Sequence, residues 1–255
     1  MTSVRIVGPG RAGTSLALAL TNVGWDVAPM LGRGDDLAGA AEDVQLLVIA
    51  TPDDTVRDVA HAVRPVPSAV VAHLSGSLGL RHLAPHPRRA ALHPLVSLPT
   101  PEIGARRLVG AWFGVAGDEP VVDKVVTSLE GRSYTVNDDD RATYHAAACI
   151  ASNHLVALLG QVERLAGDVG VPLDAYLDLV RVTLDNVAAL GPRRALTGPA
   201  ARGDEATIRR HLRALPPGER RAYRAMADAA RRLAAEPLPD PPAGAEPGSA
   251  AEPGP

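Results

Sequence analysis

The fold of this chain is decided by the stretch Val4-Arg5-Ile6-Val7-Gly8-Pro9-Gly10-Arg11-Ala12-Gly13. Its first four residues predict a β-strand, and its glycines follow the pattern G-x-G-x-x-G. An apolar, helix-forming run begins soon afterwards at Leu16. A strand, a glycine-rich turn and a helix in this order are typical of a dinucleotide-binding turn, whereas the glycine pattern without that context is weak.

Each glycine of this turn has its own physical role. Gly8 permits the tight turn, and Gly10, which has no side chain, lets a pyrophosphate approach the backbone. Gly13 allows the helix to pack closely against the strand. The free N–H groups and the positive end of the helix attract the phosphate charge. We therefore expect the turn to bind the cofactor through Gly8, Gly10, Arg11, Ala12 and Gly13.

The end of the second predicted strand indicates which dinucleotide binds. That strand covers residues 25–31 and is followed by Gly32-Arg33-Gly34. An NAD site usually has an acidic residue about twenty positions after the glycine turn, where it binds the ribose 2′-hydroxyl. Arg33 instead suits a 2′-phosphate, because a guanidinium donates two parallel hydrogen bonds to it. We predict NADP(H), with Asp35 or Asp36 as the NAD alternative if the loop is longer.

Further strands and helices alternate through the first half of the chain. This alternation is typical of a parallel α/β sheet. After Asp53 or Asp54, either of which is placed to cap it, a helix is expected to run to about Val63. We expect a Rossmann-type domain over residues 1–136, with its later strands at 44–50, 69–74, 90–92, 111–115 and 133–136.

The second half shows only helical periodicity. We expect an all-helical domain over residues 137–235 for substrate binding or dimerisation, with helices at about 141–169, 173–190, 204–215 and 218–235. Asp204 is placed to cap the third of these helices. Residues 236–255 are rich in proline and are expected to be a disordered tail.

Ligands of doubly wound sheets bind at the carboxyl ends of the strands. Thr51 and Pro52 follow one predicted strand and are expected to lie along a ribose of the cofactor. Ser75 and Gly76 follow the next strand and are expected near the nicotinamide. His93 follows a later strand and is a candidate for binding a substrate carboxylate or donating a proton.

Three histidines near these strand ends suggest a metal site at first. However, the spacing of His82, His86 and His93 does not match a zinc pattern, and the neighbouring prolines leave no shared helix face. We therefore predict no bound metal.

The long helix from about residue 141 carries polar side chains among Ala, Leu and Val. Helical spacing places Arg141, His145, Cys149 and Ser152 on one face, with Asn153 toward its edge. Burying a histidine or an asparagine without partners is costly. We therefore expect His145 and Asn153 to face a wet cleft or to bond each other, and Cys149 to be a small packing residue.

A loop at residues 196–204 precedes the predicted helix at about residues 204–215. Arg202, next to the flexible Gly203, is a candidate for binding the carboxylate of a substrate.

Composition excludes several classes of protein. The formal net charge of −3 and the aromatic content of 3% argue against nucleic-acid binding. A single cysteine, Cys149, forms no disulfide within the chain and fits a reducing cytoplasm. Neither a signal peptide nor a membrane span is expected from the sequence.

Four stretches together resemble a known bacterial family, the Rossmann-like proteins with a domain of unknown function 2520. They are Gly8–Gly13, Leu92–Leu95, Tyr144–Asn153 and Leu196–Asp204. This family is related to the 6-phosphogluconate-dehydrogenase-like and pyrroline-5-carboxylate-reductase-like enzymes. The resemblance implies an NAD(P)-binding domain followed by a helical domain that often forms a homodimer.

The chain departs from related β-hydroxyacid dehydrogenases in one respect. Those enzymes place a catalytic lysine and an asparagine four residues apart on the first long helix. Here Cys149 and Asn153 have that spacing, and Lys124, outside this helix, is the only lysine. A proton donor, if one is needed, must therefore be His145 or His93.

These observations favour an NADPH-dependent reductase of a C=O or C=N bond in a small carboxylate-bearing substrate. A 2-oxo acid such as ketopantoate and a cyclic imino acid both fit. Arg202 is expected to bind the carboxylate, His145 to donate the proton and Asn153 to orient the reacting bond. Two alternatives remain: an NADP-binding regulatory protein without turnover, and an NADP-dependent dehydrogenase of the prephenate or arogenate type.

Overall fold

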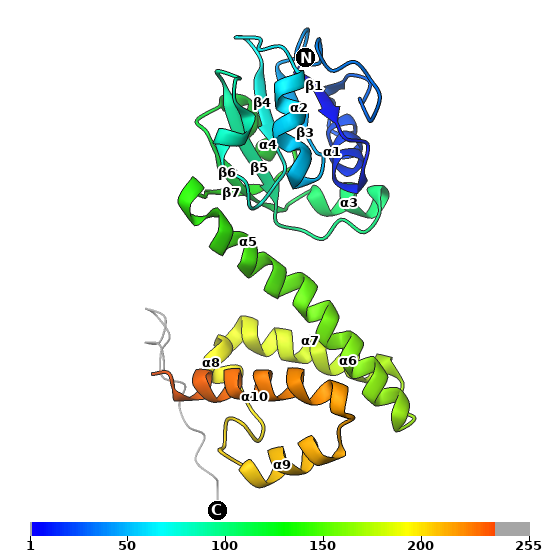
Figure 1. Cartoon of the computed structure of the whole chain (residues 1–255), viewed down its shortest axis with the longest axis vertical. Helices are drawn as coiled ribbons and strands as arrows, with labels where there is room; N and C mark the ends of the chain where they lie inside the picture. Colours follow the sequence, from blue (N-terminus) through cyan, green and yellow to red (C-terminus); the bar gives the residue numbers. More distant parts are fainter. Residues whose placement is uncertain (1, 238–255) are drawn as a thin grey trace, which may run out of the picture. The chain divides into compact units, whose positions relative to one another are not determined.

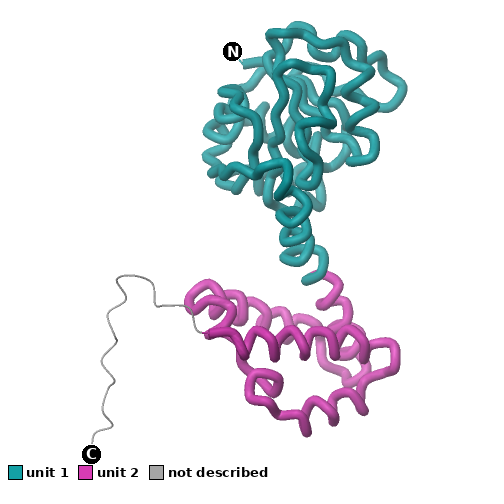
Figure 2. Tube along the Cα trace, turned by 60° about the vertical axis from the view of Figure 1, so that its left-hand side comes forward, with its two compact units in different colours: residues 1–155 teal, residues 156–255 magenta. Residues whose placement is uncertain are grey.

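The structure is a computed structural model that describes residues 2–237 (Figure 1). Its contacts divide the chain into two compact units, unit 1 (residues 1–155) and unit 2 (residues 156–255), shown in Figure 2. The sheet ends near the predicted domain boundary at residue 136, and unit 1 continues beyond it into the helix that follows. That boundary stays a prediction, and the predicted tail lies almost wholly outside the described residues.

Unit 1 is built on one sheet of seven strands, which confirms the predicted α/β fold. The strands lie in the order β2-β1-β3-β4-β5-β6-β7, and neighbours pair in parallel except for β5 and β6. Every predicted strand is present: β1 Ser3–Val7, β2 Asp26–Val27, β3 Leu46–Ile49, β4 Val70–His73, β5 Arg89–Pro94, β6 Trp112–Ala116 and β7 Arg132–Thr135.

The antiparallel pairing of β5 and β6 differs from a purely parallel sheet. A parallel neighbour requires a crossover that returns the chain to the end of the sheet where the first strand began. Here β6 begins at the same end of the sheet where β5 finishes, and the Leu95 N–H donates to the Trp112 carbonyl at 2.8 Å. The connection between these strands contains only the short helix α3, Pro101–Leu108. β6 and β7 therefore run opposite to the other five strands.

Helices cover both faces of the sheet. The core on one face joins β-strand residues to α1 (Arg11–Asn22), α3 and α4 (Pro120–Ser128). The core on the other face joins the alternate strand residues to α2 (Val56–Ala62). Strands β3 and β4 are buried throughout, as expected for strands with helices on both sides.

Strand β2 is much shorter than the predicted strand 25–31. The Asp26 and Ala28 N–H groups donate to β1, but the next donor is Leu31, to the Ile6 carbonyl at 3.0 Å, so the regular alternation is interrupted after Ala28. The chain nevertheless stays beside β1, because Leu31 forms an isolated bridge with Val7. This bridge brings the following loop next to the glycine turn.

The predicted long helix at 141–169 is present but is not uniform. It consists of α5 (Arg141–Cys149), a π-helical segment η4 (Ile150–His154) and α6 (Leu155–Asp168). A π-helical turn contains one more residue than an α-helical turn, which shifts the faces of the residues after it.

Unit 2 is helical where it is described. Its further elements are α7 Leu173–Leu190, α8 Pro192–Ala195, α9 Glu205–Ala214, the 3₁₀ turn η5 Pro217–Glu219 and α10 Arg220–Ala235. Asp204 caps α9 as predicted, since its carboxylate accepts the Thr207 N–H at 3.0 Å. Over residues 2–237, no helix combines the length and the apolar character that crossing a membrane requires.

Candidate active site

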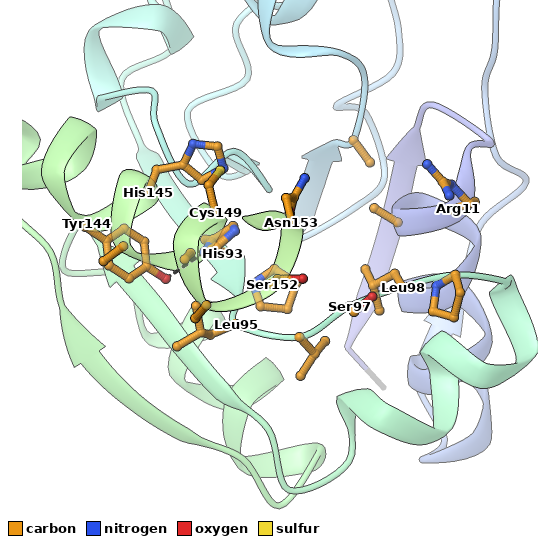
Figure 3. Close-up of a pocket in the computed structure, with 18 of the residues that line it drawn as sticks. Arg11, His93, Leu95, Ser97, Leu98, Tyr144, His145, Cys149, Ser152 and Asn153 are labelled. Carbon is orange, nitrogen blue, oxygen red and sulfur yellow. Dashed lines mark hydrogen bonds between the residues drawn. The ribbon is translucent and has the colours of Figure 1, made fainter. Parts of the chain in front are cut away.

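A cavity of about 1270 Å³ opens in unit 1 beside the carboxyl ends of β1, β3 and β5 (Figure 3). Pockets for small ligands typically have volumes of about 300–1,000 Å³. The cavity is lined by residues 10–12, 50–52, 93–99, 134, 144–145, 147–149 and 151–153. Of the residues expected to form the site, it gathers Gly10, Arg11, Ala12, Thr51, Pro52, His93, His145 and Asn153.

The glycine turn has the backbone geometry that the motif predicts. Gly8 has a φ of +110°, and a Cβ there would lie 2.7 Å from the Ala50 carbonyl oxygen. A Cβ on Gly13 would lie only 2.1 Å from the carbonyl oxygen of Gly8. A Cβ on Gly10, in contrast, would have no heavy atom within 4 Å, because this residue faces open space at the cavity. Gly8 and Gly13 thus shape the turn and Gly10 leaves room beside it.

The first turn of α1 is open to an anion. No side chain caps this helix, and its first turn contains no acidic residue. Arg11 is the first helical residue, is exposed and lines the cavity. In Figure 3 it lies on the α1 side, across the cavity from His145. Free N–H groups, the helix dipole and this guanidinium all favour negative charge here.

The loop after β2 leaves Arg33 available. Arg33 is exposed and makes no hydrogen bond or ion pair with any residue that the structure describes. The two nearby carboxylates are engaged with the loop backbone. Asp35 accepts the Gly32 N–H at 2.7 Å, and Asp36 accepts the Ala38 N–H at 2.9 Å. None of these three residues lines the cavity.

The end of β3 contributes a polar atom without a partner. The Thr51 hydroxyl is buried and makes no hydrogen bond with the described residues. Such a group is costly unless a ligand or water satisfies it. Asp53 does not cap a helix as expected. Its carboxylate instead accepts hydrogen bonds from the hydroxyls of Ser75 at 2.8 Å and Ser77 at 2.6 Å.

Ser75 and Gly76 do not line the cavity. The Ser75 hydroxyl also accepts the Ser77 and Leu78 N–H groups, so it organises its own loop. Gly76 instead packs against two residues that line the cavity: a Cβ there would lie 2.7 Å from His145 Cδ2 and 2.9 Å from His93 Nε2. Both imidazole rings therefore lie directly against this glycine.

His93, at the end of β5, takes part in a chain of hydrogen bonds. Its Nδ1 lies 2.6 Å from the Tyr144 hydroxyl, which in turn accepts a hydrogen bond from the Tyr134 hydroxyl at 3.1 Å. Burial, with the nearby His145 and Arg141 charges, lowers the pKa of His93 from 6.5 to about 4. Burial also raises the pKa of Tyr144 above its usual value, so both groups are neutral near pH 7.

His145 projects from α5 toward the same cavity. Its ring centroid lies 5.9 Å from that of His93, in an edge-to-face arrangement. Its Nε2 has only a long contact of 3.9 Å to the Cys149 sulfur. The charge of His145 is among the causes that lower the pKa of His93, so His93 is the ring that stays neutral.

The π-helical segment η4 brings further polar groups to the cavity. Ser152 and Asn153 both line it, and Figure 3 shows them among the other lining side chains. Arg141 does not share their position. It is fully buried at the start of α5, 3.5 Å from the carbonyl oxygens of Ser75 and Val136 and 3.5 Å from the Asp138 carboxylate. It thereby holds the loop after β4 against this helix.

The histidines considered for a metal site have other partners. His82 Nδ1 lies 3.1 Å from the Gly79 carbonyl oxygen, and the buried His86 Nε2 lies 2.9 Å from the Ala60 carbonyl oxygen. Among residues 2–237, no group of three potential ligand side chains lies close enough to hold a metal ion.

Arg202 belongs to unit 2, in the turn that leads into α9, and is exposed there. Its proposed contact with a substrate carboxylate stays a prediction.

Tyr134 and Gly114 were not identified from the sequence as parts of a site, and Tyr144 only as part of a family motif. Gly114 and Tyr134 can be related to His93 only through the strand register, in which His93 pairs with Gly114 and Gly114 pairs with Tyr134. Without knowing that β5, β6 and β7 are neighbours in this register, the three positions have no visible relation.

Comparison with known proteins supports the family resemblance and the fold expected from the sequence. Residues 111–230 match the model of the family described as Domain of unknown function (DUF2520), which confirms the predicted resemblance. No curated protein matches the sequence.

Solved structures share the fold across nearly the whole chain. A Bacteroides fragilis protein assigned as an NADP oxidoreductase has a TM-score of 0.76 and 22% identity, covering 91% of this chain and 98% of its own. The Plasmodium falciparum pyrroline carboxylate reductase, solved with NADP bound, has a TM-score of 0.61 and 12% identity over the same shares. An imine reductase of Streptomyces aurantiacus has a TM-score of 0.63 and 14% identity, covering 91% of this chain and 94% of its own.

Proposed function

We propose that this protein is an NADPH-dependent oxidoreductase that reduces a C=O or C=N bond. The chain matches the DUF2520 family model and shares its fold with NADP oxidoreductases. The observation that carries this proposal is the cavity in unit 1. It places an uncapped helix N-terminus at one side and a pair of histidines at the other.

The residues present fit NADP(H). Gly10 leaves space for a pyrophosphate, Arg11 supplies a positive charge and the buried Thr51 hydroxyl awaits a partner. Arg33 is free to bind a 2′-phosphate, whereas one oxygen of the Asp35 carboxylate already accepts the Gly32 N–H. We therefore assign the preference to NADPH over NADH.

Bound NADPH supplies a hydride, and the protein positions the substrate and provides the proton. His145 is our candidate proton donor, because its ring nitrogen Nε2 has only a long contact to Cys149. Asn153 is assigned to orienting the reacting bond. Arg202 is assigned to binding a carboxylate, so that the substrate class is a 2-oxo acid or a cyclic imino acid.

Two properties of the whole protein belong to this proposal. We assign it to the cytoplasm, where its single cysteine stays reduced. We also expect a homodimer through the helical unit, because α7 exposes Leu179, Val182 and Leu190 on one face.

Calorimetric titration of the purified chain with NADPH and with NADH tests the proposal. We expect tight binding of NADPH and weak binding of NADH. NADPH oxidation is then followed with panels of 2-oxo acids and cyclic imines. Absence of binding to either nucleotide would overturn the assignment as an oxidoreductase.

A further inference from the structure

Three neighbouring strands align a histidine, a glycine and a tyrosine in one row. In the sheet register His93 of β5 pairs with Gly114 of β6, and Gly114 pairs with Tyr134 of β7. Side chains at paired positions lie on the same face of a sheet. The row therefore has an imidazole at one end, a phenol at the other and an empty position between them.

The hydroxyl of Tyr144 fills that empty position. A Cβ on Gly114 would lie 2.7 Å from the Tyr144 hydroxyl oxygen and 3.0 Å from its Cζ. Only glycine leaves room for this phenol, which enters from α5 and lies edge-on to both neighbouring rings. In this place its oxygen meets His93 Nδ1 at 2.6 Å and the Tyr134 hydroxyl at 3.1 Å.

The direction of these bonds determines where His93 carries its proton. A phenol has one proton to donate. Because Tyr134 donates to the Tyr144 oxygen, the Tyr144 proton is not used in that bond and can be donated to His93 Nδ1. A neutral imidazole that accepts at Nδ1 carries its hydrogen on Nε2. Nε2 lies beside Gly76, and the ring lines the cavity.

We propose that Tyr144 is a positioning residue that fixes His93 as a neutral imidazole with its proton on Nε2, so that His93 serves the cavity as a hydrogen-bond donor. The acceptor, a carbonyl or imine group of the substrate, rests on the proposed function; the tautomer itself does not. The low pKa of His93 agrees with a ring that stays neutral. This leaves the role of acid to His145 and gives the two histidines separate tasks.

Long-range ¹H–¹⁵N NMR of the histidine side chains tests the tautomer directly in the full chain without cofactor. A His93→Gln variant identifies the His93 signals by their loss. We expect an unprotonated Nδ1 and a protonated Nε2 at pH 7. A proton on Nδ1 would overturn the proposal, since His93 would then donate to Tyr144 and present a bare Nε2 to the cavity.

Two variants test the role of Tyr144. Tyr144→Phe removes only the hydroxyl, and Gly114→Ala keeps the hydroxyl but displaces it. Both are expected to shift the two His93 signals toward a mixture of tautomers. With a substrate that is turned over, Tyr144→Phe is expected to lower kcat by about tenfold with little change in the Kd for NADPH, the loss of one hydrogen bond to the reacting group.

The chain offers a matched control in unit 2. Tyr223 of α10 bonds His211 Nδ1 at 2.6 Å, and the two rings are edge-to-face with centroids 5.7 Å apart. This pair reproduces the chemistry of the Tyr144–His93 bond. Tyr223→Phe is expected to alter the His211 signals and to leave the His93 signals and kcat unchanged.

The outcomes separate this proposal from the proposed function. Unchanged His93 signals in Tyr144→Phe would overturn the role of Tyr144, whatever the activity. Failure to bind NADPH, together with the expected tautomer, would overturn the oxidoreductase assignment and leave the Tyr144–His93 assignment standing.

Discussion

At the scale of single residues, the cavity has a guanidinium on one side and aromatic side chains on the other. Arg11 lies at the start of α1, and His93, His145 and Tyr144 lie across the cavity from it (Figure 3). No lysine lies on α5, where β-hydroxyacid dehydrogenases carry one. The proposed acid at this site is therefore His145, with His93 as a neutral hydrogen-bond donor beside it.

His145→Ala is expected to lower kcat by about 100-fold or more, because it removes the proposed proton donor. The Kd for NADPH should stay within about twofold, since no contact of His145 is part of the cofactor proposal. Steady-state kinetics and calorimetry measure the two quantities. Cys149→Ala, one helical turn away, is the control and should retain most of the turnover. A large loss of NADPH affinity in His145→Ala would assign this residue to cofactor binding instead.

Arg33→Ala is expected to weaken NADPH binding by about 10- to 100-fold, the effect of losing a charge-assisted contact to a phosphate. NADH lacks the 2′-phosphate, so its affinity serves as the internal control and should not change. Calorimetric titration of the variant with both nucleotides measures this. Equal losses for both would show that Arg33 does not distinguish them.

At the scale of elements, the strand–turn–helix unit at residues 3–22 explains most of the cavity. Its three glycines do not contribute in the same way. Gly13 is enclosed by backbone and by Ile6 and Ala50, whereas Gly10 borders open space. An added methyl group is therefore expected to affect mainly stability at Gly13 and mainly cofactor binding at Gly10.

Gly13→Ala is expected to lower the free energy of unfolding by about 3 kcal/mol, because its methyl group would clash with the Gly8 carbonyl oxygen. Gly10→Ala should cost at most about 1 kcal/mol. It should nevertheless weaken NADPH binding about tenfold, because the methyl group occupies the space beside the turn. Urea denaturation and calorimetry distinguish the two effects. Equal destabilisation by both would contradict the enclosure of Gly13.

The sequence predicts the helices and strands well where short stretches of residues determine them. All seven strands and the cap at Asp204 follow from β-branched runs, glycines and one acidic residue. The reversal of β6 is not visible, because it depends on how the chain returns after α3. The π-helical turn η4 is also not visible, because its residues have ordinary helical patterning.

At the scale of the whole molecule, buried histidines couple stability to pH. Burial and the Arg141 charge lower the pKa of His73, on β4, from 6.5 to about 4. Between these values the unfolded chain binds a proton that the folded chain does not. Stability is therefore complete above about pH 6.5 and falls as the pH decreases toward 4.

His73 alone is expected to account for about 3 kcal/mol of this loss at pH 4. Urea denaturation between pH 7 and pH 4 measures the slope. His73→Leu should flatten the profile, and His61→Leu, at an exposed position of α2, should not. A profile of His73→Leu as steep as that of the unchanged chain would exclude His73 as a source of the pH dependence.

The exposed apolar face of α7 predicts the state of assembly. We expect the chain to sediment as a homodimer and the double variant Leu179→Lys, Val182→Lys to sediment as a monomer. Leu184 is also exposed but lies on the opposite face of α7, so Leu184→Lys is the control and should remain dimeric. Analytical ultracentrifugation decides, and a monomeric unchanged chain would contradict the assembly.

The missing side chain at Gly114 also limits which substitutions can be accepted during evolution. A side chain can appear there only if the phenol at Tyr144 is withdrawn, and the phenol is useful only while the glycine persists. A substitution of either residue alone would therefore disrupt the contact between them. In relatives of this chain the two positions should therefore be exchanged together, as a linked pair that marks which lineages keep this histidine in its neutral form.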